Sequence, residues 1–289
     1  MTLHPLCVFC RLREADDGEH VISDWIRREF PRESPRGLVL ISALGRPGET
    51  WAPRSEVPFD WRVPCVCWHC NRHWLSNSVE QPAIPVLRPA LHGHHVAWTQ
   101  ADQRAVAAWV FKTTLVFHQV VPQQALIPRE HYAHLYQTRH RPTPPPRTHI
   151  WLAHYLGEKH RFGDWRSEEL RAPEPYRTQL AGYRGYVVTF CVGKLIAHVY
   201  SSFGYDERFD FAPTDTGTFD RALVAVWPIR GSAINWAPGI TQPEVGLDDR
   251  GFSELTRSFA RGDVPAFPEN LPNTALRPPA TGRHETPLA

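Results

Sequence analysis

Four cysteines in two CxxC pairs have the residue type and the spacing to bind a metal ion. They are Cys7 and Cys10 in "CVFC", and Cys67 and Cys70 in "CWHC". Two such pairs can supply the four thiolates of a tetrahedral zinc site, which leaves no coordination position open for a substrate. We therefore expect one structural Zn²⁺ that holds the two segments together.

The separation between the pairs is longer than in simple zinc ribbons, so buried free thiols remain an alternative. Cys65 could take the place of Cys67 as a ligand, since it lies two residues earlier. Cys191 lies in an apolar run and is expected to be a core thiol.

Three residues near the cysteine pairs could support phosphodiester hydrolysis. Glu19 and His20 follow the first pair, and Asn71 directly follows the second. Such hydrolysis needs a base that deprotonates water and oxygen ligands that hold a hard divalent cation. A neutral imidazole suits the first role at cellular pH. His20 is thus a candidate general base, and Glu19 and Asn71 are candidate ligands of Mg²⁺ or Mn²⁺.

Each of these side chains also has a plainer interpretation. Glu19 and His20 precede a predicted helix and could merely charge or cap its start. His73 could be a further metal or phosphate ligand, although a single histidine on a helix is more often a surface or core residue. Glu80 could reach the site, but a structural role such as holding Arg72 is preferred.

The overall charge gives no general case for nucleic-acid binding. The chain has 32 basic and 30 acidic residues among 289, a formal net charge of +2. Any polyanion site must therefore be a local patch. Arg27, Arg28 and Arg72 are candidate phosphate contacts because guanidinium groups bind phosphate oxygens in pairs. Solvated helix arginines are an equally common interpretation.

A histidine cluster offers a third possibility of another class. His92, His94 and His95 lie together in "HGHH" and could hold a catalytic zinc in a hydrolase. No carboxylate at a suitable spacing accompanies them.

The elements that position the candidate site follow from periodicity. "SDWIRREF" has Ser23 as a helix N-cap and Trp25, Ile26 and Phe30 at helical spacing. "LVLISAL" and "FDWRVPCVC" are expected to be strands, and a helix should begin near Cys70. Closure of the zinc site would then bring the two halves of the catalytic set together.

The rest of the chain predicts a mixed arrangement. "ADQRAVAAWVFKTTLVFHQVV" should be a core helix, and Pro128 should begin a second one. Strands are expected in "HIWLAHYL", "YVVTFCV", "LIAHVYSS" and "RALVAVWPI", with a two-residue turn at Gly193 and Lys194. "SELTRSFARG" should be a short helix, and the proline-rich stretch from about residue 263 should be disordered.

The segments "CVFC", "EHVISDW" and "CVCWHCN" resemble the zinc-knuckle variety of HNH endonucleases, in the ββα-metal or His-Me finger superfamily. The likeness is to bacterial and phage proteins with an EHVxPxW-like start and a CxxCNxGWMSxLE-like second half. Here that half reads "CWHCNRHWLSNSVEQPAIPVLRP", with one residue inserted between Ser76 and Glu80. The likeness continues more weakly through "AAWVFKTTLV" and "VWPIRGSAINWAP", but its specific motifs lie in residues 7–89.

This resemblance implies that His20 is the general base and that Glu19 and Asn71 hold one Mg²⁺ or Mn²⁺. The middle asparagine of the HNH name has no clear counterpart, and Arg62 falls near its place. Residues 31–57 would be an insertion.

We therefore expect an α+β protein with a zinc-stabilised ββα-metal finger in residues 1–90. A mixed helix and antiparallel-sheet domain of unknown role would occupy residues 91–262, followed by a tail in residues 263–289. The expected activity is hydrolysis of DNA, with RNA not excluded, in phage defence or mobile-element biology. A regulatory protein partner or a homo-oligomer is compatible with this. The alternative is a non-catalytic zinc-dependent module that binds nucleic acid or protein through a degenerate HNH site.

Hydropathy argues against a membrane protein. No run approaches the roughly 18 apolar residues that a spanning helix needs, and the first residues lack the pattern of a signal peptide. A cytoplasmic location is the expectation.

Overall fold

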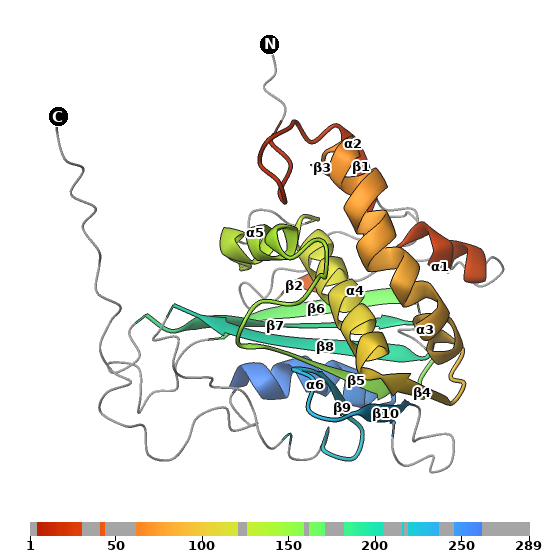
Figure 1. The fold of residues 1–289 in the computed structure, drawn as a ribbon. Helices are drawn as coiled ribbons and strands as arrows, with labels where there is room; N and C mark the ends of the chain where they lie inside the picture. The colour runs from red at the N-terminus through yellow and green to blue at the C-terminus, as the bar shows by residue number, and fades with distance from the viewer. Residues whose placement is uncertain are drawn as a thin grey trace, which may run out of the picture.

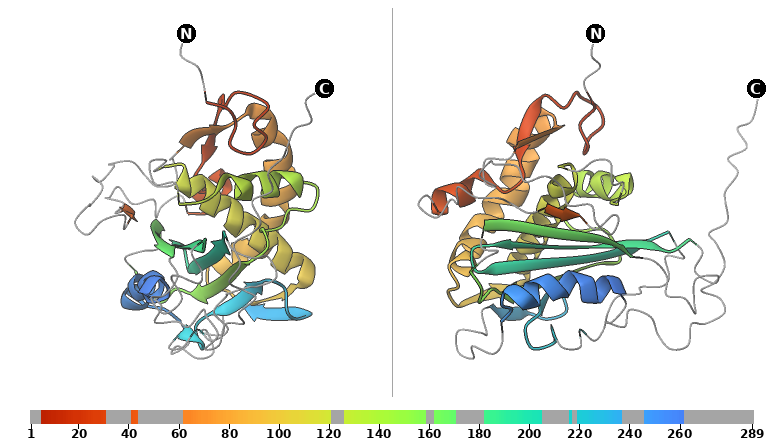
Figure 2. Two further views of the ribbon diagram at one scale, coloured as in Figure 1. Left: turned by 90° about the vertical axis from the view of Figure 1, so that its left-hand side faces the viewer. Right: turned by 180° about the vertical axis from the view of Figure 1, so that it is seen from behind.

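The computed structural model describes residues 5–30, 41–43, 62–120, 126–158, 162–170, 182–204, 216, 219–236 and 246–261. In these parts a six-stranded mixed sheet has helices on both faces (Figures 1 and 2). The predicted α+β class is confirmed, because helices and antiparallel strands both occur.

The N-terminal unit consists of two paired strands and a long helix. β1 (Asp17–His20) is antiparallel to β3 (Arg62–Val66), and α1 (Asp24–Glu29) follows β1. Directly after β3, α2 (Trp68–Cys70), η2 (Asn71–Glu80) and α3 (Gln81–Leu91) form one continuous rod (Figure 1). β1 was not predicted as a strand, and the described part of the predicted strand "LVLISAL" is β2, which joins the large sheet. The strand predicted in "FDWRVPCVC" is present as β3, and the helix after it begins two residues before Cys70.

η2 is a π-helix of ten residues. A π turn closes with i→i+5 hydrogen bonds and so holds more residues than an α turn. The stretch includes the place, between Ser76 and Glu80, where the resemblance requires one inserted residue. In an α-helix, residues nine apart face opposite sides, whereas nine residues of π-helix make about two turns. Asn71 and Glu80, at the two ends of η2, therefore face about the same side.

α4 (Gln100–His118) lies between the N-terminal unit and the sheet (Figure 1). Its start is fixed by a capping box in which Thr99 and Asp102 exchange hydrogen bonds. Every residue from Val106 to His118 is buried, as expected for a helix that is enclosed on all sides. The predicted core helix is confirmed.

The large sheet has the order β2-β6-β7-β8-β5-β9, and only the pair β2–β6 is parallel. Gly193 has φ +58° and, with Lys194, forms the predicted two-residue turn between β7 and β8. The strand bounds are β2 (Ile41–Ala43), β5 (Thr148–His154), β6 (Phe162–Leu170), β7 (Arg184–Val192), β8 (Leu195–Phe203) and β9 (Val224–Trp227). A second, two-stranded sheet pairs β4 (Val96–Thr99) with β10 (Ala233–Trp236).

Both faces of the large sheet are buried. In β7, Val188 and Phe190 belong to the core beneath α4, whereas Val187 and Cys191 belong to a second core beneath α6 (Asp249–Arg261). Figure 2 shows α4 and α5 (Arg129–Gln137) on one side of the sheet and α6 on the other. Such strands are apolar along their whole length. Cys191 is the core thiol that we expected.

The larger core continues across residue 90. It includes Cys7 and Val66 of the N-terminal unit together with Trp109 and Phe190. The proposed insertion at residues 31–57 lies outside the described residues except for β2, and the proposed tail at 263–289 lies wholly outside them. Among the helices that the structure describes, none has the length and apolar character needed to cross a membrane.

Candidate functional site

The four predicted cysteines converge at the end of the N-terminal unit where α2 begins the helical rod, and α2 is labelled at the top of Figure 1. Their sulfur atoms all lie within 4.8 Å of one another, and Sγ of Cys10 lies 3.8 Å from Sγ of Cys67. Sulfurs at about 2.3 Å from one tetrahedral ion would have this spacing. The four cysteines are thus positioned to hold a metal ion, and the geometry is compatible with structural zinc.

Local hydrogen bonds prepare this cluster. The backbone N–H of Cys70 donates to Sγ of Cys67 at 3.4 Å, and a hydrogen bond from the Cys70 thiol lowers the pKa of Cys7 to about 4. The thiolate is the form that binds metal. Cys65 is buried and lies outside the cluster, and burial raises its pKa. The second pair is therefore Cys67 with Cys70.

His20 ends β1 and lies opposite Arg62 of β3. Nε of Arg62 donates to Nε2 of His20 at 3.0 Å, so Nε2 is unprotonated and the ring proton is on Nδ1. Burial, and after it the charge of Arg62, lowers the pKa of His20. The ring is therefore neutral, as a general base must be, but Arg62 occupies the lone pair of Nε2.

Glu19 is bound by a buried lysine. Nζ of Lys112 donates to Oε1 of Glu19 at 2.6 Å and to Oε1 of Glu80 at 2.8 Å. The Lys112 side chain is 0% exposed and that of Glu19 is 5% exposed. Burial raises the pKa of Glu19. Burial by itself would lower the pKa of Lys112, but the charges of Glu19 and Glu80 outweigh it and raise that pKa. One ammonium thus holds two carboxylates in the interior.

Ser23 extends this network to α4. Its hydroxyl donates to Oε1 of Glu80 at 2.6 Å and accepts from Nε1 of Trp109 at 3.0 Å. Ser23 occupies the N-cap position of α1, as expected, but its side chain makes no capping hydrogen bond. The network therefore joins β1, the start of α1, the end of η2 and α4. Glu80 contacts Lys112 and Ser23, and no contact with the expected partner Arg72 occurs among the described residues.

Asn71 contacts a carboxylate that the sequence analysis did not single out. Nδ2 of Asn71 donates to Oδ2 of Asp17 at 3.0 Å, and Nε of Arg72 lies 3.6 Å from the same oxygen. Asp17 and Asn71 are both partly exposed. They offer two oxygen-bearing side chains for a hard cation, whereas Glu19 is engaged by Lys112.

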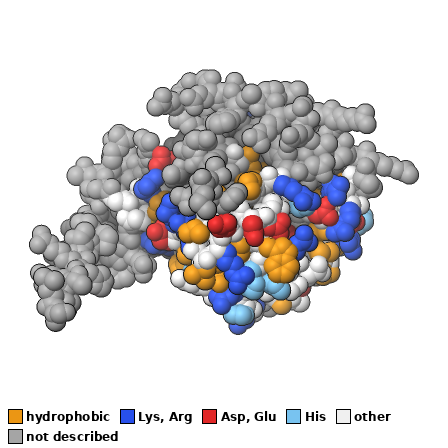
Figure 3. Space-filling model, turned by 90° about the horizontal axis from the view of Figure 1, so that it is seen from above, with side chains coloured by type: hydrophobic (Ala, Val, Ile, Leu, Met, Phe, Trp, Pro, Cys, Tyr) orange, Lys and Arg blue, Asp and Glu red, His pale blue; other side chains and the backbone are white. Residues whose placement is uncertain are grey.

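The arginines predicted to contact phosphate are exposed and have carboxylate neighbours. Arg27 and Arg28 lie 2.7 Å and 3.5 Å from Asp24 oxygens, within α1. Arg72 lies beside Asp17. Seen from above in Figure 3, basic, histidine, acidic and apolar side chains are interspersed over the described part of this face. The field there is mixed, so phosphate binding by these arginines stays a prediction.

The other candidate histidines lie outside the cysteine cluster. His73 is exposed and its ring contacts the rings of Trp68 and His69, with centroids 5.4 Å and 4.6 Å away. His92 pairs with Glu29 at 3.1 Å. Within the described residues, the cysteine cluster is the only group of three or more His, Cys, Asp or Glu side chains with the spacing of metal ligands. The HGHH run, with His92, His94 and His95, therefore does not form a metal site of this kind.

Comparisons of the chain with protein-family models, with curated proteins and with solved structures found no match. The motif resemblance therefore stays a prediction that rests on the residues themselves.

Proposed function

We propose that the protein is a metal-dependent endonuclease that hydrolyses DNA phosphodiester bonds in its N-terminal unit. One arrangement carries the proposal. β1 ends at His20, Arg62 lies opposite it, and Asn71 begins the π segment of the helix that follows β3. The cysteine cluster joins both halves of this arrangement.

In this proposal His20 removes a proton from water, which attacks phosphorus as the bond to the 3′ oxygen breaks. The products carry a 5′ phosphate and a 3′ hydroxyl. Asn71 and Asp17 would hold Mg²⁺ or Mn²⁺, which supplies positive charge for the leaving oxygen. Asp17 replaces Glu19 as the expected carboxylate ligand, because Lys112 holds Glu19. The role of Glu19 is then to fix the end of β1 to α4.

Arg62 links substrate binding to the base. Its guanidinium holds Nε2 of His20 in the structure, and guanidinium groups bind phosphate in a bidentate manner. A substrate phosphate that attracts Arg62 would release the lone pair of Nε2. His20 would then become a base only when substrate is present.

The test is plasmid cleavage with Mg²⁺ or Mn²⁺ by the full chain. We expect His20→Ala to reduce cleavage at least about 100-fold, the lower range for general-base removal, with unchanged zinc content. His73→Ala is the matched control and should cleave normally. Equal cleavage by the wild type and His20→Ala would refute the proposal.

A second candidate is a non-catalytic module that binds nucleic acid through a degenerate site. The hydrogen bond from Arg62 to His20 and the ion pair of Lys112 with Glu19 favour it, because both proposed catalytic side chains are engaged. It predicts that DNA or RNA binds without being cleaved under any divalent ion.

A further inference from the structure

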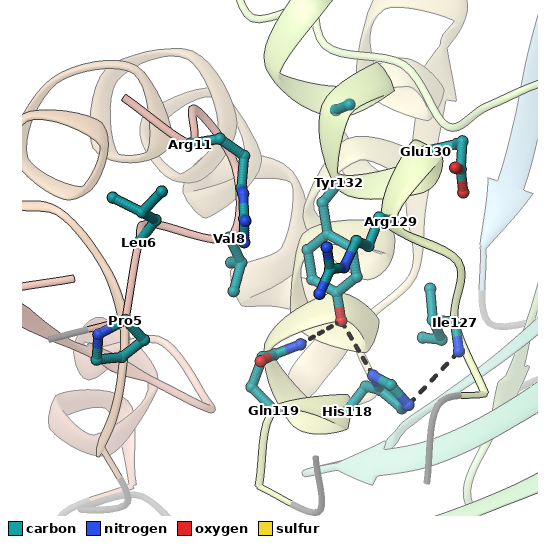
Figure 4. A pocket seen from close by; sticks show the side chains of 11 residues that line it. Pro5, Leu6, Val8, Arg11, His118, Gln119, Ile127, Arg129, Glu130 and Tyr132 are labelled. Carbon is teal, nitrogen blue, oxygen red and sulfur yellow. Dashed lines mark hydrogen bonds between the residues drawn. The ribbon is translucent and has the colours of Figure 1, made fainter. Parts of the chain in front are cut away.

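A cavity of about 500 Å³ lies between the cysteine knuckle and the start of α5 (Figure 4). Leu6, Val8 and Arg11 line it from the knuckle side, and Arg129 and Ile127 line it from the α5 side. No residue of the proposed catalytic site lines it. It is therefore a separate feature that the proposed function does not explain.

Two arginines point into this cavity from opposite sides. Figure 4 shows Arg11 and Arg129 directed toward one another, while the carboxylate of Glu130 is turned away from both. Neither guanidinium forms an ion pair with any residue that the structure describes. Two like charges that converge on one space are stabilised by an anion between them. The start of α5, where Pro128 gives no side-chain cap, adds the positive end of a helix dipole.

The floor of the cavity is a closed hydrogen-bond network. The hydroxyl of Tyr132 accepts from Nε2 of Gln119 at 2.7 Å and donates to the carbonyl of Leu115 at 3.1 Å. His118 lies 3.1 Å from the same hydroxyl and accepts from the backbone N–H of Leu126. Because these groups hydrogen-bond to one another, the floor is held in place, and a ligand need not supply hydrogen bonds to it.

The walls are apolar. Pro5, Leu6, Val8 and Ile127 contribute them, and Leu6 is 41% exposed. A ligand that matches the cavity thus has an anionic group for the arginines and a less polar body for the walls. An inorganic anion alone would leave the walls uncovered.

We propose that the cavity binds the phosphate of a nucleotide between Arg11 and Arg129, with the sugar and base against Leu6 and Ile127. The choice of a nucleotide among organic anions rests on the proposed function. A nucleotide within a DNA or RNA strand would extend the substrate contact beyond the bond that is cleaved. A free nucleotide would act as a regulator.

The test is fluorescence anisotropy with the zinc-loaded full chain, without added Mg²⁺, Mn²⁺ or chelator. The probe is a six-nucleotide 5′-phosphorylated oligothymidylate that carries a fluorophore at its 3′ end. We expect Arg11→Gln and Arg129→Gln each to weaken binding about tenfold or more, the effect of one charge-assisted contact. Arg13→Gln, on the same knuckle, and Arg141→Gln, beyond α5, should change it less than about twofold. Leu6→Glu, which changes an exposed residue, should weaken binding by repulsion.

Competition identifies the source of the phosphate. Displacement by thymidine 5′-monophosphate supports a free nucleotide, and displacement only by longer strands supports a nucleotide within a strand. Equal displacement by thymidine or by inorganic phosphate overturns the nucleotide assignment. Equal losses in the Arg13 and Arg141 controls overturn the site. A chain that fails to cleave but binds in an Arg11- and Arg129-dependent manner refutes the proposed function and leaves this inference standing.

Discussion

Lys112 decides what Glu19 can do. An ammonium that is wholly buried between two carboxyl groups stabilises them only while it stays charged. A second cation at Glu19 would have to displace Lys112 or share its carboxylate. This is why Asp17, which lies beside Asn71 on the more exposed side, is the better ligand in our proposal.

Replacement of Lys112 by methionine removes the charge and keeps most of the volume. We expect Lys112→Met to lower the free energy of unfolding by about 3–5 kcal/mol, because the buried Glu19 loses its ammonium partner and Glu80 keeps only the hydrogen bond from Ser23. Lys194→Met, at a partly exposed lysine 3.4 Å from Glu158, should cost less than about 1 kcal/mol. Urea unfolding measures both, and equal costs would contradict the assigned role of Lys112.

The pH dependence of that variant has a definite sign. Without Lys112, burial and the neighbouring Glu80 raise the pKa of Glu19 further above its unfolded value, and Glu80 loses the ammonium that lowers its pKa. The folded variant gains stability by protonation as the pH falls, so the loss relative to wild type should shrink from pH 8 to pH 5.

At the scale of elements, the π geometry of η2 lets Asn71 and Glu80, at its two ends, face about the same side of the helix. If residues 71–80 were an α-helix, Glu80 would face away from the side to which Asn71 points. With the wider π turns, Asn71 reaches Asp17 and Glu80 reaches Lys112. The resemblance predicts an inserted residue in this stretch, but sequence alone could not say that the helix would be a π-helix here.

Deletion of one residue tests this reading of η2. Without the exposed Asn77, Asn71 and Glu80 are eight residues apart, about 2.2 α turns, which is about 80° beyond two full turns. We expect the deletion to shorten the π segment, to keep both contacts because the remaining π turns take up the difference, and to change the Tm little. Deletion of Ala105 in α4, the control, turns the buried part of that helix by about 100° relative to its start and should lower the Tm sharply. Similar losses in the two deletions would contradict the role given to the π-helix.

Other elements show where sequence reasoning succeeds and where it fails. The periodicity of α4 and the glycine turn between β7 and β8 are local signals, and both predictions were confirmed. β6 escaped prediction because "FGDWRSEEL" is polar and gains strand geometry from pairing with β7. The roles of Lys112 and Asp17 depend on contacts between distant segments.

At the scale of the whole molecule, both faces of the large sheet are buried, and they enclose histidines whose protonation would be costly in the folded state. Burial lowers the pKa of His198 to about 3, and burial followed by the charge of His134 lowers that of His131 to about 3. His198 lies beneath α6, hydrogen-bonded to Thr189 and in contact with the ring of Phe259. The folded state therefore keeps both rings neutral well below the pH at which the unfolded chain protonates them.

These histidines should make the fold acid-sensitive. Between pH 6.5 and about 3 the unfolded chain binds a proton at each ring and the folded chain does not. The free energy of unfolding therefore decreases as the pH decreases, by about 1.4 kcal/mol per pH unit for each histidine. Urea unfolding of His198→Gln should show a slope smaller by one such contribution, whereas the exposed His140→Gln should keep the wild-type slope. An unchanged slope in His198→Gln would show that His198 is charged in the folded state.

The central claim is that one small scaffold holds both a structural zinc and a catalytic ion. Anomalous diffraction from crystals soaked in Mn²⁺, recorded at the zinc and manganese edges, tests it most directly. We predict a zinc peak about 2.3 Å from the sulfurs of Cys7, Cys10, Cys67 and Cys70, and a manganese peak bound by Asn71 and Asp17 on the side of the unit that substrate can reach. A zinc peak elsewhere, or no manganese at Asn71, would contradict the account.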